Sequence, residues 1–375
     1  MSLAHRRLAF WAITLALPLI GLELASFALA RLRPDLFDDR EAVLAQITPA
    51  DFSRALPTMS HTLGWDNPAS AELRARNCAG EEVVATYDVD RIRLHGAGTP
   101  RDAVVLVAGD SYTHGNAVAD DATYPAALER ILGVPTANLG VSGYGPDQAL
   151  LRLESTIARK PRAKVAIMSI LYDDTARMLN RFRPILQRPT TRAFGLKPYV
   201  EDGAFHAIPG RNPYDRFEGF MAAARSAYDT DYWRRPRAQF PYTASVAEMI
   251  VLPSFWIPAL TQVAEGLGRA HYEPVHRVPS IRRDLRALYA RFAEWSRQHG
   301  LRAVVVLIPV DARDQTSGLL ATATATEAQR RTLTFHNVTT GDGSTYRHVG
   351  WCHPSPAGYR SIAESVAAVV RPLLP

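Results

Sequence analysis

The stretch VVLVAGDSYTHGNA, residues 104–117, decides the fold prediction for this chain. Its first five residues are apolar and predict a strand that is buried on both faces. Gly109 then breaks the pattern and is followed by Asp110 and Ser111. Side chains that follow a buried strand lie at its carboxyl end, where parallel sheets bind their ligands. Ser111 is therefore the first candidate for a catalytic residue.

Beyond residue 102 the chain alternates short apolar runs with helical patterns. Further strands are predicted at Val165–Leu171 and Ala303–Ile308, and a weaker one leads into Asn138–Leu139. Apolar residues at helical spacing, with start signals such as Thr123, predict helices at 123–132, 146–158, 280–300 and 356–370. This alternation predicts an α/β fold in which a parallel sheet carries helices on both faces.

Two stretches do not follow this alternation. Residues 31–101 are rich in turn-forming residues and predict a stalk and an irregular lead-in before a main domain of residues 102–375. From about residue 175 to residue 279 the chain is dense in Pro, Arg and aromatic residues, and we interpret it as a long insertion beside the site. Within it, HYEPVH at 271–276 lacks the spacing of a zinc site and predicts a surface loop.

Residues 1–30 contain the apolar run LAFWAITLALPLIGLELASFALA, in which Glu23 is the only charged residue. At 1.5 Å per residue, a helix of this length covers the hydrocarbon core of a bilayer. The run exceeds a signal-peptide core of about 7–15 residues, which favours an uncleaved membrane anchor. Ala28 and Ala30 also offer a small-x-small cleavage site, so a cleaved signal peptide remains an alternative.

The composition excludes several classes of function. The 375 residues are 47% hydrophobic and 21% charged, as in ordinary globular proteins. The net charge is +6, but the basic residues are scattered and form no stripe or zinc finger, which argues against nucleic-acid binding. No glycine-rich phosphate loop is present, and no cofactor or metal is predicted. In an exported chain Cys78 and Cys352 could form one disulfide or remain two separate thiols.

A second candidate, His353, lies in the sequence WCHPSPAG just before the last predicted helix. A serine nucleophile needs an adjacent base and donors for the developing oxyanion. Ser111 follows the first strand and His353 follows the last, so both are expected on one rim of the sheet, within reach of a hydrogen bond. The order G-x-S-x-G is absent, which excludes the nucleophile elbow of the α/β-hydrolases.

These motifs together resemble the sequence blocks of the SGNH/GDSL esterases and acyltransferases. VAGDSYTHG resembles the first block, with Ser111 as the nucleophile, and NLGVSGYG resembles the second, in which the Gly143 amide donates to the oxyanion. ILYDDTARM stands where the third block is expected, and HPSPAGYRSIAE resembles the fifth, with His353 as the base. The resemblance implies a three-layer α/β/α sandwich with a flavodoxin-like sheet, and serine chemistry without a metal. The N-terminal pattern GLELASFALARL is similar to that of membrane-anchored bacterial members.

The sequence departs from the family pattern at two positions. The Asn of the oxyanion hole is replaced by Asp173, and an ionised carboxylate accepts hydrogen bonds but cannot donate one. Asp173 must therefore be protonated, turn away or serve another role. The Asp that precedes the His in the family is also missing, and Gly350 and Trp351 occupy its place. The carbonyl of Gly350 or the carboxylate of Asp342 could orient the His353 ring instead.

The resemblance implies a serine esterase or O-acyltransferase that works through an acyl-serine intermediate. The expected substrate is an ester, such as an acetyl group, on a cell-envelope glycan, a lipid or a small molecule. The expected location is the inner membrane, with a single span and the catalytic domain on the periplasmic side. The alternative is a catalytically silent SGNH-like module that binds glycan or scaffolds an envelope assembly.

Overall fold

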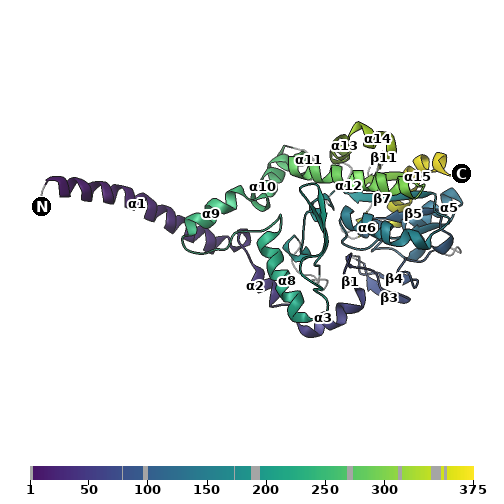
Figure 1. Ribbon diagram of the computed structural model, residues 1–375, viewed down its shortest axis with the longest axis horizontal. Coiled ribbons are helices and arrows are strands. Elements are labelled where there is room, and N and C mark those ends of the chain that lie inside the picture. The colour runs from purple at the N-terminus through teal and green to yellow at the C-terminus, as the bar shows by residue number, and fades with distance from the viewer. Residues whose placement is uncertain are drawn as a thin grey trace.

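A computed structural model describes residues 3–77, 79–95, 100–172, 174–186, 195–267, 273–310, 315–338, 348–349 and 353–375. Within these residues, a five-stranded parallel sheet forms the centre of the molecule (Figure 1). Across the sheet the strands are β11 (Leu333–Asn337), β10 (Arg302–Ile308), β7 (Val165–Leu171), β5 (Val105–Ala108) and β6 (Thr136–Asn138). Every neighbouring pair is parallel. From the β6 edge the strands follow the order second, first, third, fourth, fifth, which is the flavodoxin-like arrangement and confirms the predicted fold class.

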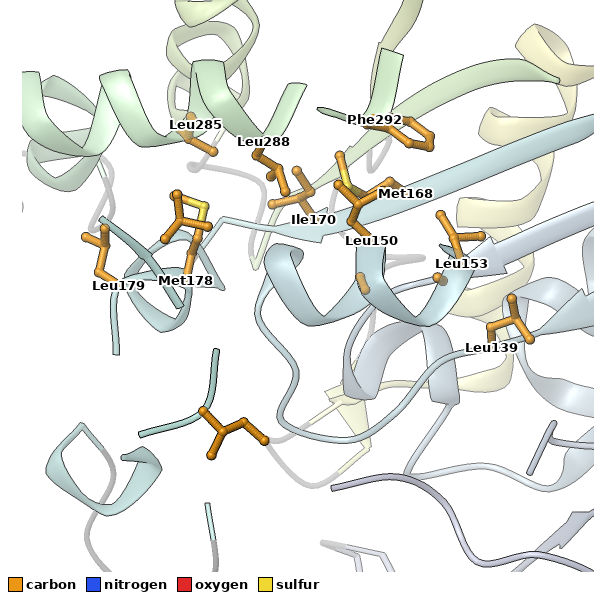
Figure 2. Close-up of a cluster of buried hydrophobic side chains, with 14 of the residues drawn as sticks. Leu139, Leu150, Leu153, Met168, Ile170, Met178, Leu179, Leu285, Leu288 and Phe292 are labelled. Atoms are coloured by element: carbon orange, nitrogen blue, oxygen red, sulfur yellow. The ribbon is translucent and has the colours of Figure 1, made fainter. Parts of the chain in front are cut away.

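Alternate residues of each strand face two different helical layers, because successive side chains of a strand point to opposite sides. Val105 and Val107 belong to one core with α5 (Tyr124–Leu132) and α15 (Pro356–Val370). Leu106 faces the other layer, formed by α6 (Pro146–Thr156) and α12 (Pro279–Gln298). Figure 2 shows side chains of this second layer packed near β7: Leu150, Leu153, Met168, Ile170, Leu285, Leu288 and Phe292.

The predicted helices form, and local signals explain where they begin and end. Thr123 caps α5, because its hydroxyl accepts a hydrogen bond from Ala126 N at 3.3 Å. Ser355 caps α15 in the same way, accepting from Gly358 N at 3.1 Å. After α12 the chain turns at Gly300, whose φ of +64° lies in the left-handed region that favours glycine.

Residues 31–101 contain more regular structure than their sequence predicts. They include α2 (Arg40–Leu44), α3 (Pro49–Ala55), β1 (Met59–Ser60), β2 (Gly64–Trp65) and a hairpin of β3 (Ala71–Arg76) and β4 (Glu82–Tyr87). Val43, Leu44 and Phe52 belong to the main core, so this part of the segment packs against the body. A bridge from Arg93 to Asn138 continues the edge of the sheet beyond β6.

The chain between β7 and α12 adds elements on the side of the sheet that faces the N-terminal helix (Figure 1). They are α7 (Asp174–Met178), β8 (Tyr199–Glu201), β9 (Ala204–His206), α8 (Phe217–Thr230), α9 (Tyr242–Val251), α10 (Pro253–Gly266) and α11 (Glu273–Arg277). His276 lies on α11 and is only 1% exposed, so the predicted surface loop at 271–276 is wrong at this position. His276 packs into the core, which its spacing from His271 in the sequence did not indicate.

The remaining elements are short or peripheral. They are α4 (Ser111–His114), α13 (Gln315–Thr324), α14 (Glu327–Thr332), β12 (His348–Val349) and β13 (His353–Pro354).

The N-terminal helix α1 (Leu3–Leu32) projects from the body (Figure 1). Among the described residues it is the one helix that is long and apolar enough by itself to cross a membrane, with a mean hydropathy of 1.9 over Phe10–Leu32. This is consistent with the predicted anchor and equally with a signal segment. Both cysteines lie outside the described residues, so a disulfide and two separate thiols both stay open.

Candidate active site

The turn after β5 leaves Ser111 at the start of α4, in a strand–turn–helix connection. Gly109 packs so closely here that a Cβ atom would lie 2.2 Å from Thr113 Oγ1, so larger residues do not fit. Asp110 caps α4, because its Oδ1 accepts a hydrogen bond from Tyr112 N at 2.9 Å. The local sequence therefore places Ser111, 9% exposed, at the carboxyl end of a central strand.

The half-buried Arg177 joins the ends of three neighbouring strands beside Ser111. The Ser111 hydroxyl donates to Asp110 Oδ2 at 3.2 Å, and Arg177 Nη1 donates to the same oxygen at 3.4 Å. Arg177 also donates to Tyr144 O at 3.3 Å and forms an ion pair with Asp174. Asp110 follows β5, Tyr144 follows β6, and Arg177 and Asp174 follow β7. The guanidinium therefore fixes the relative positions of the three turns.

The loop after β6 brings Gly143 to the same rim. Val141 N donates to Gly109 O at 3.1 Å, so this loop remains paired with the chain of β5 as far as the turn before Ser111. Gly143 has a φ of +83°, and a Cβ atom there would meet Trp65 only at 3.6 Å. The backbone conformation, and not lack of space, therefore requires glycine at this position.

The rim is reachable from solvent past partly exposed side chains. Asn116 Nδ2 donates to Ser142 Oγ at 2.8 Å and ties the loop after α4 to the loop after β6. Trp65 Nε1 donates to Ser142 O at 3.0 Å, and its ring meets Tyr144 edge-on at 5.7 Å. Trp65, Asn116 and Ser142 are all half-buried, so solvent reaches this side of the rim.

His353 reaches the rim from the far end of the chain. It lies on β13, opposite Val349 of β12, and Pro354 then leads directly into the cap of α15. The half-buried His353 ring packs against the ring of Tyr112, with their centroids 5.5 Å apart. Tyr112 is the residue directly after Ser111. The structure thus brings the segments of Ser111 and His353 together, although β6, β7, β10 and β11 lie between them in the sequence.

The other predicted site residues, Asp173, Gly350 and Asp342, lie outside the described residues. Their roles in the oxyanion hole and in orienting the His353 ring stay predictions. Within the described part of the chain, no group of three or more His, Cys, Asp or Glu side chains is arranged to hold a metal ion.

The sequence pattern of the GDSL-like lipase/acylhydrolase family matches residues 107–361, more than half of the chain. The chain belongs to this family. The match begins within β5 and extends into α15, so it includes Ser111, Gly143 and His353. Membership makes this GDSL-family protein an ester hydrolase or an acyltransferase. No curated protein matches the chain in sequence.

The GDSL motifs did not predict two residues of the rim. For Arg177 a signal was present, because Asp174 and Arg177 stand three residues apart, a spacing that pairs side chains on one helical face. Trp65 had no such signal, since it lies outside the region that matches the GDSL-family pattern. It reaches the loop after β6 only through the short β1–β2 hairpin.

Proposed function

We propose that this protein is a serine esterase or O-acyltransferase in which Ser111 is the nucleophile and His353 is the general base. One observation carries the proposal: the His353 ring packs 5.5 Å from the ring of Tyr112, the residue next to Ser111. A base must come within hydrogen-bonding distance of the hydroxyl that it deprotonates, and apo structures often hold such pairs loosely. The backbone amides of Ser111 and Gly143 are the proposed oxyanion donors.

In the acylation step, Ser111 Oγ attacks the ester carbonyl carbon while its proton passes to His353. The hydroxyl donates to Asp110 in the resting structure, so its proton must first turn toward the His353 ring. Arg177 and Tyr112 N hold Asp110 in place during this rotation. Collapse of the tetrahedral intermediate breaks the ester C–O bond, and His353 returns the proton to the leaving alkoxide.

In the second step, His353 deprotonates a water molecule or an acceptor hydroxyl, whose oxygen attacks the acyl-serine. The bond between the acyl carbon and Ser111 Oγ then breaks, and His353 returns the proton to Oγ. Water yields a free carboxylic acid, and an acceptor hydroxyl yields a new ester. The same residues serve both outcomes. The proposed substrate is an ester, such as an acetyl group, of a cell-envelope glycan or lipid. With α1 as an uncleaved anchor in the inner membrane, the catalytic domain would meet this substrate on the periplasmic side.

A fluorophosphonate probe applied to the full-length protein tests the nucleophile directly. We expect covalent labelling of the wild type, and no labelling of Ser111→Ala. His353→Ala should slow labelling by about 10²–10⁴-fold, the range typical of a lost general base. Thermal unfolding of each variant should match the wild type, which separates lost chemistry from lost structure.

Ser142→Ala is the matched control, because Ser142 is a second serine on the same rim. It should be labelled like the wild type. If labelling survives in Ser111→Ala but disappears in Ser142→Ala, the nucleophile is Ser142 and the proposal for Ser111 is wrong. A folded wild type that never reacts with the probe would favour the silent glycan-binding module instead.

A further inference from the structure

Helices α9 and α10 form a bent pair with an apolar outer face, which we call the elbow (residues 242–266). The two helices meet at Leu252 with a bend of 58°, and together they are as apolar as a membrane span. Its outward side chains include Ile250 and Val251 on α9 and Leu260 and Val263 on α10, each at least half exposed. In a soluble protein these apolar side chains would remain exposed to water.

A carboxylate from α1 fixes the beginning of the elbow. Glu23 Oε1 accepts a hydrogen bond from Tyr242 N at 2.6 Å, and its Oε2 accepts from Thr243 N at 2.9 Å and Thr243 Oγ1 at 2.5 Å. These bonds satisfy amide groups that the first turn of α9 would otherwise leave without partners. Glu23 is also the only charged residue of the apolar run, and this contact gives it a specific role.

Apolar packing continues along the two helices from this point. Met249 of α9 is buried with Ala30 of α1 and with Phe37, just beyond the end of α1. Figure 1 shows α9 beside the last turns of α1, and α10 leading from there to the globular body. The exposed apolar surface of α1 therefore continues onto the elbow, so that a bilayer that surrounds α1 would meet both.

The geometry of the elbow excludes a second crossing of the membrane. The helices α9 and α10 contain 10 and 14 residues. At about 1.5 Å per residue, each is shorter than a hydrocarbon core of about 30 Å. The chain enters the elbow from the body, where Asp38 N donates to Pro236 O at 2.9 Å, and leaves it for α11. Both ends thus remain on the side of the globular domain.

We propose that the elbow is a second membrane contact, which lies in the interface of the same bilayer that α1 spans. The inference rests on the proposed role of α1 as an uncleaved anchor. Lipid, and not a protein partner, is the occupant because the elbow surface is continuous with a helix that is apolar all round. With two contacts, the catalytic domain has a fixed orientation toward the membrane and does not swing on a flexible stalk.

The charges near the elbow indicate which lipids it needs. Arg237 lies 3.4 Å from Asp229 and 3.8 Å from Asp38, and Arg234 lies 4.0 Å from Glu248. Because acidic partners offset these arginines, attraction to anionic headgroups adds little. Burial of apolar side chains then provides the binding energy, and zwitterionic phosphatidylcholine is sufficient.

Depth-dependent quenching in reconstituted liposomes tests the elbow. The fluorescent residue dansylalanine replaces Val263, 60% exposed, in the full chain, and the matched control carries it at Leu319 of α13, 62% exposed. We expect the emission of the label at position 263 to be blue-shifted. Doxyl groups near the lipid headgroups should quench it more than doxyl groups deep in the acyl chains, because interfacial helices lie only about 5–10 Å into the bilayer. Emission at position 319 should stay red-shifted and unquenched.

Flotation of the same liposomes and fluorophosphonate labelling keep the proposals apart. If the chain floats with lipid but position 263 is quenched no more than position 319, the elbow inference is wrong while the anchor stands. If the chain does not float, the anchor fails, and with it the basis of the elbow. Fluorophosphonate labelling reports on Ser111 independently of either result.

Discussion

Two polar networks of this protein differ in their exposure to solvent. On the rim of the sheet, Asp110 is buried, but Arg177, Ser142 and His353 beside it are half-buried and reachable from outside. The second network lies between α6 and the chain around Lys197. There Lys197 Nζ donates to Asp147 Oδ2 at 2.7 Å, Asn180 O at 3.3 Å and Pro198 O at 2.5 Å. Both charged side chains of this second network are completely buried.

Burial shifts the pKa values of the network without solvent access. Burial lowers the pKa of Lys197 and raises the pKa of Asp147, while the attraction between the two charges opposes both shifts. Nearby, burial raises the pKa of Asp231 to about 6. Perturbed groups often indicate an active site, yet all three protons of the Lys197 ammonium already have acceptors. The shifted pKa values of this network therefore have a structural cause, and solvent access distinguishes the candidate catalytic rim from it.

The largest predicted effect on stability follows from removing the cation of the buried network. Lys197→Met leaves the Asp147 carboxylate buried without its partner, which should cost about 3–5 kcal/mol in the free energy of unfolding. Urea denaturation monitored by circular dichroism measures this loss. The rim is not part of this network, so the folded fraction of the variant should react with a fluorophosphonate at the wild-type rate.

The double variant Lys197→Met/Asp147→Leu is the control for this comparison. Removing both charges leaves no unpaired ion, so most of the lost stability should return. If the double variant is as unstable as the single one, the pair does more than neutralise a buried charge. A folded double variant that has lost its labelling would show that the two networks are coupled, and the distinction between them would fail.

A smaller effect is expected from His276 of α11, whose buried ring meets the ring of Tyr172, just after β7, edge-on. Complete burial lowers its pKa from 6.5 to about 4, because the charged ring loses its hydration. The folded state therefore binds fewer protons than the unfolded state between these two values. The stability that neutral His276 contributes is fully present above pH 6.5 and is lost as the pH falls toward 4.

In His276→Gln this pH dependence should shrink by on the order of 3 kcal/mol between pH 7 and pH 4. Denaturant titrations at the two pH values measure it. His61→Gln, at a histidine whose side chain is 53% exposed, is the control, and its stability should depend more steeply on pH than that of His276→Gln. If the free energy of unfolding of His276→Gln depends on pH as in the wild type, the ring of His276 is hydrated despite its burial, and the inference is wrong.

The sequence was sufficient for the regular part of the fold because burial there follows simple periods. Val165–Leu171 is buried throughout and apolar except at Ser169, since both faces of a central strand are covered, and α12 shows its buried stripe at helical spacing. The edge strand β11 was missed because only Leu333 of it is fully buried, so the apolar run that reveals a central strand is absent.

The candidate residues of the rim were predictable only where a motif names them. Ser111, Gly143 and His353 stand in such motifs. Trp65 lies at the rim because it contacts a segment that is distant in sequence, and no local pattern predicts such a contact. His276 was misplaced for a related reason: its burial depends on tertiary packing of α11 and not on the spacing of neighbouring residues. The Lys197–Asp147 pair likewise joins positions 50 residues apart.

The smallest predicted effect separates backbone strain from chemistry. Gly143 and Gly133 have similar left-handed conformations, with φ of +83° and +71°, and neither lacks room for a methyl group. Alanine at either position should therefore cost about 1–2 kcal/mol of stability. Only Gly143→Ala should displace a proposed oxyanion donor and slow ester hydrolysis, up to the roughly 10²–10³-fold loss of a missing donor. Gly133 ends α5 away from the rim, so Gly133→Ala should hydrolyse model esters normally. Equal hydrolysis rates in the two variants would remove Gly143 from the oxyanion hole and confine the reacting centre to Ser111 and His353.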